Sequence, residues 1–250
     1  MKKNILLHHY PQQLVWKKAS QYLIDKLEQV KKEGKNILLF LSGGSVVQLY
    51  GQLAEVIKKG GFKSDDLVIA QVDERYIKNQ ISKIKNTNQK LKINKDINAE
   101  NIGQTGLWED CRNKKIPYYL VSQKGTLKSS TEEYNKTVSK LFPRYDFRMA
   151  ILGMGKDGHT AGLMSGHEKI WNINDYVIGY KLDQKQMFKQ RITITPFMLS
   201  KLDYALAGMV GEEKKQALES TLNPDNFDEL DKYPAAIIQR IKKVDVFTDL

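Results

Sequence analysis

Short apolar runs and longer amphipathic segments alternate along most of the chain. The apolar runs are typical of buried strands, and we expect strands at residues 36–41, 67–72, 117–121, 149–152, 176–182, 191–195, 204–210, 235–238 and 244–247. Apolar residues near helical spacing predict helices at residues 14–32, 46–59, 130–141, 196–202 and 212–220, with part of 78–101 also helical. Gly34 ends the first of these helices, as a glycine often does. The pattern therefore predicts strands and helices in alternation.

This order of elements favours one class of fold. A strand followed by a helix and a second strand is typical of a parallel sheet covered by helices. We therefore expect an α/β fold with a mainly parallel sheet and helices on both faces, Rossmann-like in arrangement. No break in composition, no repeat and no low-complexity segment divides the chain, so a single domain is expected over residues 1–250. Ligands of such sheets bind beyond the carboxyl ends of the strands.

The charge of the chain bears on its partners. The 250 residues have a formal net charge of +11, which suits either a nucleic acid or a small anionic substrate. The densest basic stretch, residues 78–95, lacks aromatic residues on which bases could stack. We interpret it as a solvated surface and expect no nucleic-acid partner.

Cysteine usage and hydropathy bear on location. Cys111 is the only cysteine, so no internal disulfide can form, as is typical of a reducing compartment. The basic N-terminus has only three consecutive apolar residues, too few for a signal peptide, and no run approaches the ~20 residues of a membrane span. A cytoplasmic protein without a membrane partner is expected.

The first candidate motif is the turn Ser42-Gly43-Gly44-Ser45, which joins a predicted strand to a predicted helix. Backbone N–H groups at a helix N-terminus bind anions, and two glycines let the chain wrap a phosphate. The alternative is a tight turn in which Ser45 caps the helix. The motif alone does not separate the two interpretations.

The second candidate motif, Asp73-Glu74-Arg75, directly follows the strand at 67–72. A carboxylate at the end of a strand could position a hydroxylated substrate, and arginine binds phosphate through two hydrogen bonds. The alternative is a surface ion pair, which contributes little to stability. Three charged residues directly after a buried strand favour the functional interpretation.

The third motif follows the strand at 149–152 and carries an acid and a base in one glycine-rich turn. Gly153, Gly155 and Gly158 formally match a dinucleotide-binding fingerprint. Small or helix-breaking residues follow where that fingerprint needs a helix, so we reject it. Asp157 and His159 are the chemically useful pair, and histidine suits a general base near neutral pH.

Two more cations are candidates for a phosphate site. Arg191 begins a predicted strand, and Lys214 lies in the first turn of a predicted helix. Both could instead form salt bridges. No histidine, cysteine and aspartate cluster has the spacing of a metal site, and no metal or organic cofactor is expected.

Taken together, these segments resemble the 6-phosphogluconolactonase family, in the larger group that includes glucosamine-6-phosphate deaminase and ribose-5-phosphate isomerase. The resemblance is carried in order by residues 41–45 (LSGGS), 72–75 (VDER), 153–161 (GMGKDGHTA), 191–195 (RITIT), 211–214 (GEEK) and 233–236 (YPAA). The match at residues 153–161 is the most specific of these. The sequence departs from the family at Val46-Val47, at Gly162–Ser165 and in the serine–asparagine pair after the second motif, for which Thr87-Asn88 is the nearest match.

The resemblance implies hydrolysis of 6-phospho-D-glucono-1,5-lactone to 6-phosphogluconate, a step of the pentose phosphate pathway. His159 would be the general base, with Asp157 orienting it and Asp73 as a further catalytic residue. Backbone N–H groups of a glycine turn would stabilise the oxyanion. The substrate and its phosphate would be held by Ser42, Gly43, Gly44, Ser45, Arg75, Asn88, Gly155, Arg191 and Lys214. The partner would be a small phosphorylated sugar lactone, and the chain a monomer or small homo-oligomer.

Three positions distinguish the lactonase from its relatives. Deaminases of the group carry a glutamate five residues after the motif histidine, where this chain has Met164. Thr160 and Arg75 stand where deaminases carry isoleucine and tyrosine. A deaminase or sugar-phosphate isomerase, and a non-catalytic sugar-phosphate-binding protein, remain the alternatives, with nucleic-acid binding third.

Overall fold

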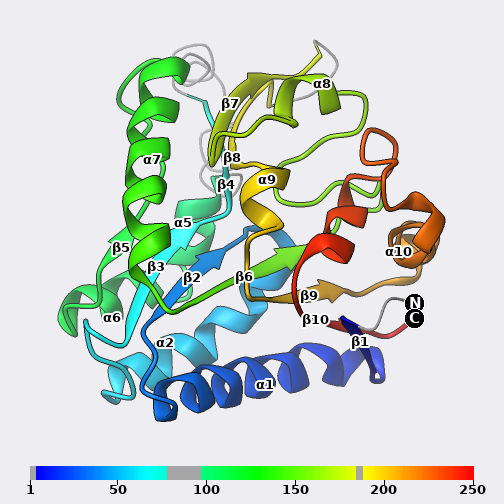
Figure 1. The fold of residues 1–250 in the computed structure, drawn as a ribbon. Coiled ribbons are helices and arrows are strands. Elements are labelled where there is room, and N and C mark those ends of the chain that lie inside the picture. The colour runs from blue at the N-terminus through cyan, green and yellow to red at the C-terminus, as the bar shows by residue number, and fades with distance from the viewer. Residues whose placement is uncertain (1–3, 78–96, 184–187) are drawn as a thin grey trace, which may run out of the picture.

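The computed structural model describes residues 4–77, 97–183 and 188–250. Its centre is a seven-stranded parallel sheet (Figure 1). From one edge to the other the strands are β1 (Ile5–His9), β10 (Val244–Thr248), β9 (Tyr204–Met209), β6 (Phe147–Gly153), β2 (Ile37–Leu41), β3 (Leu67–Gln71) and β5 (Tyr118–Tyr119). The α/β fold with a parallel sheet is thus confirmed.

Helices cover both faces of this sheet (Figure 1). The α-helices are α1 (Gln12–Lys32), α2 (Tyr50–Lys58), α5 (Asn98–Gly103), α6 (Leu107–Asn113), α7 (Leu127–Leu141), α8 (Glu168–Trp171), α9 (Pro196–Leu199) and α10 (Lys215–Leu222). The 3₁₀ helices are η1 (Gly44–Leu49), η2 (Phe142–Arg144), η3 (Glu212–Lys214), η4 (Pro224–Asn226) and η5 (Pro234–Arg240). None of the helices in the described ranges is long and apolar enough to cross a membrane.

Two hydrophobic cores lie on opposite faces of the sheet. Successive side chains of a strand point to opposite faces. In β2, Leu38 and Phe40 accordingly pack into the core with α7, α10 and η5, while Leu39 packs into the core with α1, α2 and α6. Burial on both sides explains why the central strands read as continuous apolar runs.

A second, antiparallel sheet stands apart from the first and is made of β4 (Asp73–Arg75), β8 (Gln190–Ile194) and β7 (Val177–Lys181). The strands expected at 176–182 and 191–195 are confirmed, but they join this small sheet rather than the parallel one. The register places Asp73 opposite Thr193 and Arg75 opposite Arg191. The small sheet therefore brings two sequence motifs into contact.

The prediction of a strand at 235–238 was wrong, since these residues form part of η5. Pro234 fixes the backbone at the start of that helix, and the N–H of Ala235 donates to the carbonyl of Gly158 at 3.0 Å instead of joining a sheet. The segment is apolar because it is buried between the sheet and the 153–158 turn. An apolar run of this length does not distinguish a buried strand from a buried helix.

Other differences concern element ends and elements without a clear pattern. The helix expected at 46–59 is η1 followed by α2, and the one expected at 212–220 is η3 followed by α10. The helix expected at 130–141 begins earlier, because Thr126 and Ser129 form a capping box. β1, α6 and α8 were missed. The interpretation of residues 78–95 as a solvated surface lies outside the described residues, and the single domain over 1–250 stays a prediction.

Candidate active site

A cavity of about 290 Å³ opens at the carboxyl ends of the central strands. Its wall is formed by the turns that follow β2 and β6, by β4, which follows β3 in the chain, and by Lys214 of η3. The lining residues are Ser42, Gly43, Gly44, Ser45, Asp73, Arg75, Asn98, Gly153, Met154, Gly155, His159, Ala161, Gly162 and Lys214. The three motifs that the sequence placed at strand ends therefore meet in one cavity.

The turn after β2 forms the wall beside η1. Gly44 has a φ of +75°, a conformation that favours glycine, and it begins η1. A Cβ on Gly43 would lie 2.0 Å from Oδ1 of Asn98, so the chain passes directly against that amide. The first N–H groups of a helix have no partner within it and can face an anion. The hydroxyl of Ser42 is buried without a hydrogen-bond partner in the described structure.

Lys214 completes this end of the cavity. Its Nζ donates to Oγ of Ser45 at 3.4 Å, and the side chain is almost fully buried. Burial lowers the pKa of Lys214, while Glu213 and Asp249 partly oppose the shift. Ser45 does not cap η1, whose N-cap is Gly43. The alternative interpretation of Ser45 as a helix cap is therefore wrong.

Asp73 and Arg75 project from β4 toward the cavity, and Glu74 between them is fully buried. Burial raises the pKa of Asp73, and the charges of Arg191, Arg75 and His159 oppose the rise. Since the charges of all three groups act on Asp73, each of them lies near this carboxylate. Nη1 of Arg75 donates to Oδ1 of Asn98 at 3.3 Å. Asp73 and Arg75 thus form a cavity wall and not an isolated surface ion pair.

Arg191 lies opposite Arg75 in the small sheet but does not line the cavity itself. Its Nη1 is buried without a hydrogen-bond partner in the described part of the chain. Burial and the neighbouring charge of Arg75 lower the pKa of Arg191, and Asp73 opposes them. Two adjacent guanidinium groups give this wall a strong positive potential, which favours an anion.

His159 and Asp157 are held by a turn with internal hydrogen bonds. The N–H of Gly155 donates to the carbonyl of His159 at 2.9 Å, and the N–H of Gly158 donates to the carbonyl of Gly155 at 3.0 Å. Oδ1 of Asp157 lies 2.5 Å from Nδ1 of His159. This contact lowers the pKa of Asp157, which therefore stays ionised and accepts the Nδ1 proton.

The imidazole is consequently oriented for proton transfer at its other nitrogen. With Nδ1 bonded to Asp157, neutral His159 carries its lone pair on Nε2. Nε2 makes no hydrogen bond to any part of the chain that the structure describes, and His159 lines the cavity. A Cβ on Gly155 would come within 2.3 Å of the imidazole and 2.5 Å of the Asp157 carboxylate. A glycine at position 155 therefore leaves the space that the side chains of His159 and Asp157 occupy.

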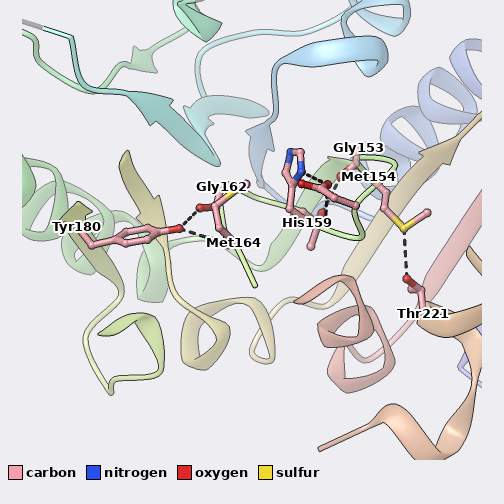
Figure 2. Close-up of polar contacts among 9 residues, drawn as sticks. Gly153, Met154, His159, Gly162, Met164, Tyr180 and Thr221 are labelled. Carbon is pink, nitrogen blue, oxygen red and sulfur yellow. Dashed lines mark hydrogen bonds and ion pairs between the residues drawn. The ribbon is translucent and has the colours of Figure 1, made fainter. Parts of the chain in front are cut away.

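The segment after His159 is fixed by both sheets (Figure 2). Oγ1 of Thr160 donates to the carbonyl of Gly153 at 2.7 Å, and the hydroxyl of Tyr180 donates to the carbonyl of Gly162 at 2.5 Å. Gly162 has a φ of +67°, and a Cβ there would lie 2.9 Å from Cβ of Asp73. The departure from the family at this position thus leaves room for Asp73.

Met164 does not line the cavity. It is buried in the core, its N–H donates to the Tyr180 hydroxyl at 3.2 Å, and its carbonyl accepts from the indole of Trp171 at 3.0 Å. No carboxylate therefore enters the cavity from this position.

Asn98 is the site residue that the sequence did not reveal. It lines the cavity, its Nδ2 donates to the carbonyl of Asp73 at 2.9 Å, and its Oδ1 accepts from Arg75. The sequence prediction named Asn88 instead, which lies outside the described residues. Several asparagines occur between 86 and 101, and no local pattern says which of them reaches the site.

Glu74, between Asp73 and Arg75 on β4, also has a perturbed carboxyl group. Burial raises its pKa to about 7, although backbone N–H groups of Ala99, Asn98 and Arg75 and the amide of Gln71 donate to it and oppose the rise. A raised folded-state pKa means that the native state binds a proton more tightly than the unfolded chain. The stabilising contribution is present at low pH and is lost as the pH rises through about 7.

This gives a prediction for stability. Between the ordinary value of 4.5 and about 7, ionisation of Glu74 is expected to lower the free energy of unfolding by about 3 kcal/mol. Glu74→Gln should remove this part of the pH dependence, because the amide does not ionise. Urea unfolding of both proteins at pH 5 and pH 8 measures it. An equal pH dependence in the two proteins would show that Glu74 is ionised throughout.

No group of three histidine, cysteine, aspartate or glutamate side chains in the described ranges could hold a metal ion. The site consists of an oriented histidine, carboxylates and cations around one cavity.

The chain has a parallel sheet, a cavity at the carboxyl ends of the strands and a glycine-rich turn before a helix. These features define the class of Rossmann-like α/β proteins. Residues 11–247 match the family of glucosamine-6-phosphate isomerases and 6-phosphogluconolactonases, and the chain belongs to that family.

Several known proteins of similar sequence or structure are named 6-phosphogluconolactonase. A 6-phosphogluconolactonase of Xylella fastidiosa is 26% identical over 230 residues, covering 88% of this chain and 86% of that protein. The crystal structure of 6-phosphogluconolactonase from Thermotoga maritima shares the fold with a TM-score of 0.72 and 23% identity, covering 98% of each chain. The 6-phosphogluconolactonase from Plasmodium vivax gives a TM-score of 0.74 at 20% identity, covering 98% of this chain and 89% of that one.

Proposed function

We propose that this chain hydrolyses 6-phospho-D-glucono-1,5-lactone to 6-phosphogluconate, a step of the pentose phosphate pathway, with residues 1–250 as one domain. The observation that carries the proposal is the His159–Asp157 pair on the wall of a cavity whose other walls bear Lys214 and Arg75. The names of the similar proteins support the same reaction. The buried Met164 argues against a deaminase, because it offers no carboxylate to the cavity.

His159 is the general base. Nε2 takes a proton from water while the water oxygen attacks the lactone carbonyl carbon, and a tetrahedral oxyanion forms. The bond from that carbon to the ring oxygen then breaks, and the imidazolium returns its proton to the departing oxygen. Asp157 holds the ring by Nδ1 and stabilises its positive charge in the intermediate.

Arg75 stabilises the oxyanion. The sequence suggested backbone N–H groups of a glycine turn for this task, but the N–H groups of Gly155 and Gly158 donate within their own turn. Arg75 lines the cavity, and the charges of both Arg75 and His159 oppose the raised pKa of Asp73, which supports a position of the guanidinium near the carbonyl that His159 would serve. Preorganised donors of this kind are often the largest single contribution to catalysis. Arg191 behind it adds positive charge, and Asp73 is placed to hold a sugar hydroxyl.

The phosphate lies at the other end of the cavity. The N-terminus of η1, the hydroxyls of Ser42 and Ser45 and the ammonium of Lys214 converge there. An anion would satisfy the buried Ser42 hydroxyl and compensate the buried charge of Lys214. A phosphorylated lactone therefore fits the cavity better than a neutral one.

Three compounds test this assignment. The account expects rapid hydrolysis of the phosphorylated lactone, much slower hydrolysis of glucono-1,5-lactone, and no ammonia from glucosamine 6-phosphate. Acid release followed at constant pH measures the first two, and an ammonia assay the third. Ammonia release would identify a deaminase. Binding of 6-phosphogluconate without faster lactone hydrolysis would identify a non-catalytic binding protein.

Gly155→Ala is expected to lower kcat about 10²-fold, because its methyl group would displace the His159–Asp157 pair by a sizeable part of an ångström. The matched control is Gly51→Ala, at a helical glycine of α2 with open space around it. It should keep wild-type activity and gain up to about 1 kcal/mol in stability. Wild-type kcat in Gly155→Ala would mean that the pair moves aside without loss.

A further inference from the structure

Glu74 is the buried ionisable group of the site that the proposed reaction does not use. Its neighbours Asp73 and Arg75 reach the cavity, while the alternation along β4 turns Glu74 away from it. A carboxylate rarely occurs fully buried without a specific set of partners. The hydrogen-bond partners of Glu74 therefore indicate its role.

All four partners of Glu74 are donors. Oε1 accepts from the N–H of Arg75 and the N–H of Asn98, both at 2.8 Å. Oε2 accepts from the N–H of Ala99 at 2.8 Å and from Nε2 of Gln71 at 2.9 Å. Only the ionised carboxylate satisfies all four, because a protonated oxygen would direct its own hydrogen toward a donor.

Two of these donors are the first residues of α5. The N-cap residue Ile97 gives this helix no side-chain cap, so Glu74 satisfies its first N–H groups from a different element. Asn98 is thereby placed with its Nδ2 on the carbonyl of Asp73 and its Oδ1 on Nη1 of Arg75.

We propose that Glu74 is a positioning residue, which anchors the start of α5 so that the Asn98 amide holds the guanidinium of Arg75 in place for catalysis. This inference rests on the proposed function for its kinetic readout, but the anchoring itself does not. Glu74 binds the N-terminus of α5 and does not contact the substrate.

Charged and titratable groups face Glu74 from each neighbouring element. Asp73 and Arg75 flank it on β4, Arg191 faces it from β8, Tyr134 from α7, and Glu100 lies in the first turn of α5. The pKa of Glu74, raised to about 7 by burial, means that the anchor is complete only above neutral pH. The other titratable groups are the same in wild type and in Glu74→Gln. Their effect on the pH profile therefore cancels in the ratio of the two activities.

The test is a double-mutant cycle with Glu74→Gln and Asn98→Ala, measured as kcat/KM for the phosphorylated lactone from pH 5.5 to 8.5. We expect Glu74→Gln to lower kcat/KM about tenfold at pH 8, with a smaller loss below pH 6, where wild-type Glu74 is also neutral. On the Asn98→Ala background the substitution should have no further effect. Additive losses, or a ratio independent of pH, would overturn the proposal. Asn98→Ala alone should show the same pH-dependent loss of kcat/KM. This variant keeps Glu74, so it tests the proposal even if Glu74→Gln does not fold.

Glu100→Gln is the matched control, since it makes the same change on the exposed side of α5 and should leave kcat/KM unchanged. Hydrogen exchange at the Ala99 amide separates this inference from the reaction. Exchange should be faster in Glu74→Gln than in wild type at pH 8, even if the wild-type protein does not hydrolyse the lactone. Equal exchange would overturn the anchoring.

Discussion

Replacement of His159 by glutamine is expected to lower kcat for lactone hydrolysis by about 10²–10⁴-fold, the usual contribution of a general base. Glutamine keeps a polar side chain on the turn but cannot take a proton from water. The loss should appear in kcat rather than in KM, because in the proposed binding mode the phosphate lies beside Lys214 and not beside His159. A stopped assay with freshly prepared lactone, corrected for spontaneous hydrolysis, measures it.

The control for this variant is His167→Gln. His167 is half-buried, contacts the carbonyl of Ser165 through Nδ1 at 2.9 Å, and does not line the cavity. It should retain wild-type kcat. Far-UV circular dichroism should be the same for both variants, since the His159 ring is hydrogen-bonded only to Asp157 among the described residues. A His159→Gln protein with wild-type activity would remove His159 from the mechanism.

Lys214→Met is expected to raise KM for the phosphorylated lactone by about 10–100-fold, because a hydrogen bond to a charged group contributes roughly 1.5–3 kcal/mol. The protein itself should not lose stability. The ammonium is buried, its pKa is lowered by that burial, and methionine fills a similar volume. In addition, inorganic phosphate should raise the melting temperature of the wild type but not of the variant.

Lys215→Met provides a matched control one residue further on. Lys215 is exposed, and its Nζ lies 3.6 Å from Glu212 in a surface ion pair. The same loss of charge there should leave KM and the phosphate-induced rise in melting temperature unchanged. If both variants bind phosphate as the wild type does, the phosphate does not lie beside Lys214.

The sequence was sufficient to predict the parts of the site that local chemistry determines. The strand before each motif is buried on both faces and reads as an apolar run, and the carboxyl ends of parallel strands meet at one edge. The turn with Asp157 and His159 could be predicted because glycines and a base stand together after such a strand. The meeting of residues 42–45, 73–75 and 153–159 in one cavity confirms that reasoning.

The remainder depends on contacts between distant segments. β1 pairs with β10 at the other end of the chain, and two of its leucines are exposed, so no local pattern marks it as a strand. The small antiparallel sheet arises because β4 pairs with β8, which places Arg75 opposite Arg191. Asn98 lines the cavity from the start of α5, where the N–H groups of Asn98 and Ala99 donate to Glu74 of a distant strand. Tertiary hydrogen bonds of this kind leave no periodic signal in the sequence.

The separation of the two sheets gives each a role in the site. The parallel sheet carries the turn proposed to bind the phosphate and the histidine proposed as the base, after β2 and β6 respectively. The small sheet supplies Asp73, Arg75 and Arg191, and Tyr180 from the same sheet binds the carbonyl of Gly162 beside Asp73. We infer that catalysis requires both sheets in their present arrangement.

The rate of 6-phospho-D-glucono-1,5-lactone hydrolysis by the purified wild-type chain near pH 7 tests the central claim most directly. ³¹P NMR follows the lactone and 6-phosphogluconate separately, and a sample without protein gives the spontaneous rate. We predict that the initial rate rises in proportion to the protein concentration and saturates with the lactone. A rate equal to the spontaneous one at every protein concentration would contradict the assignment.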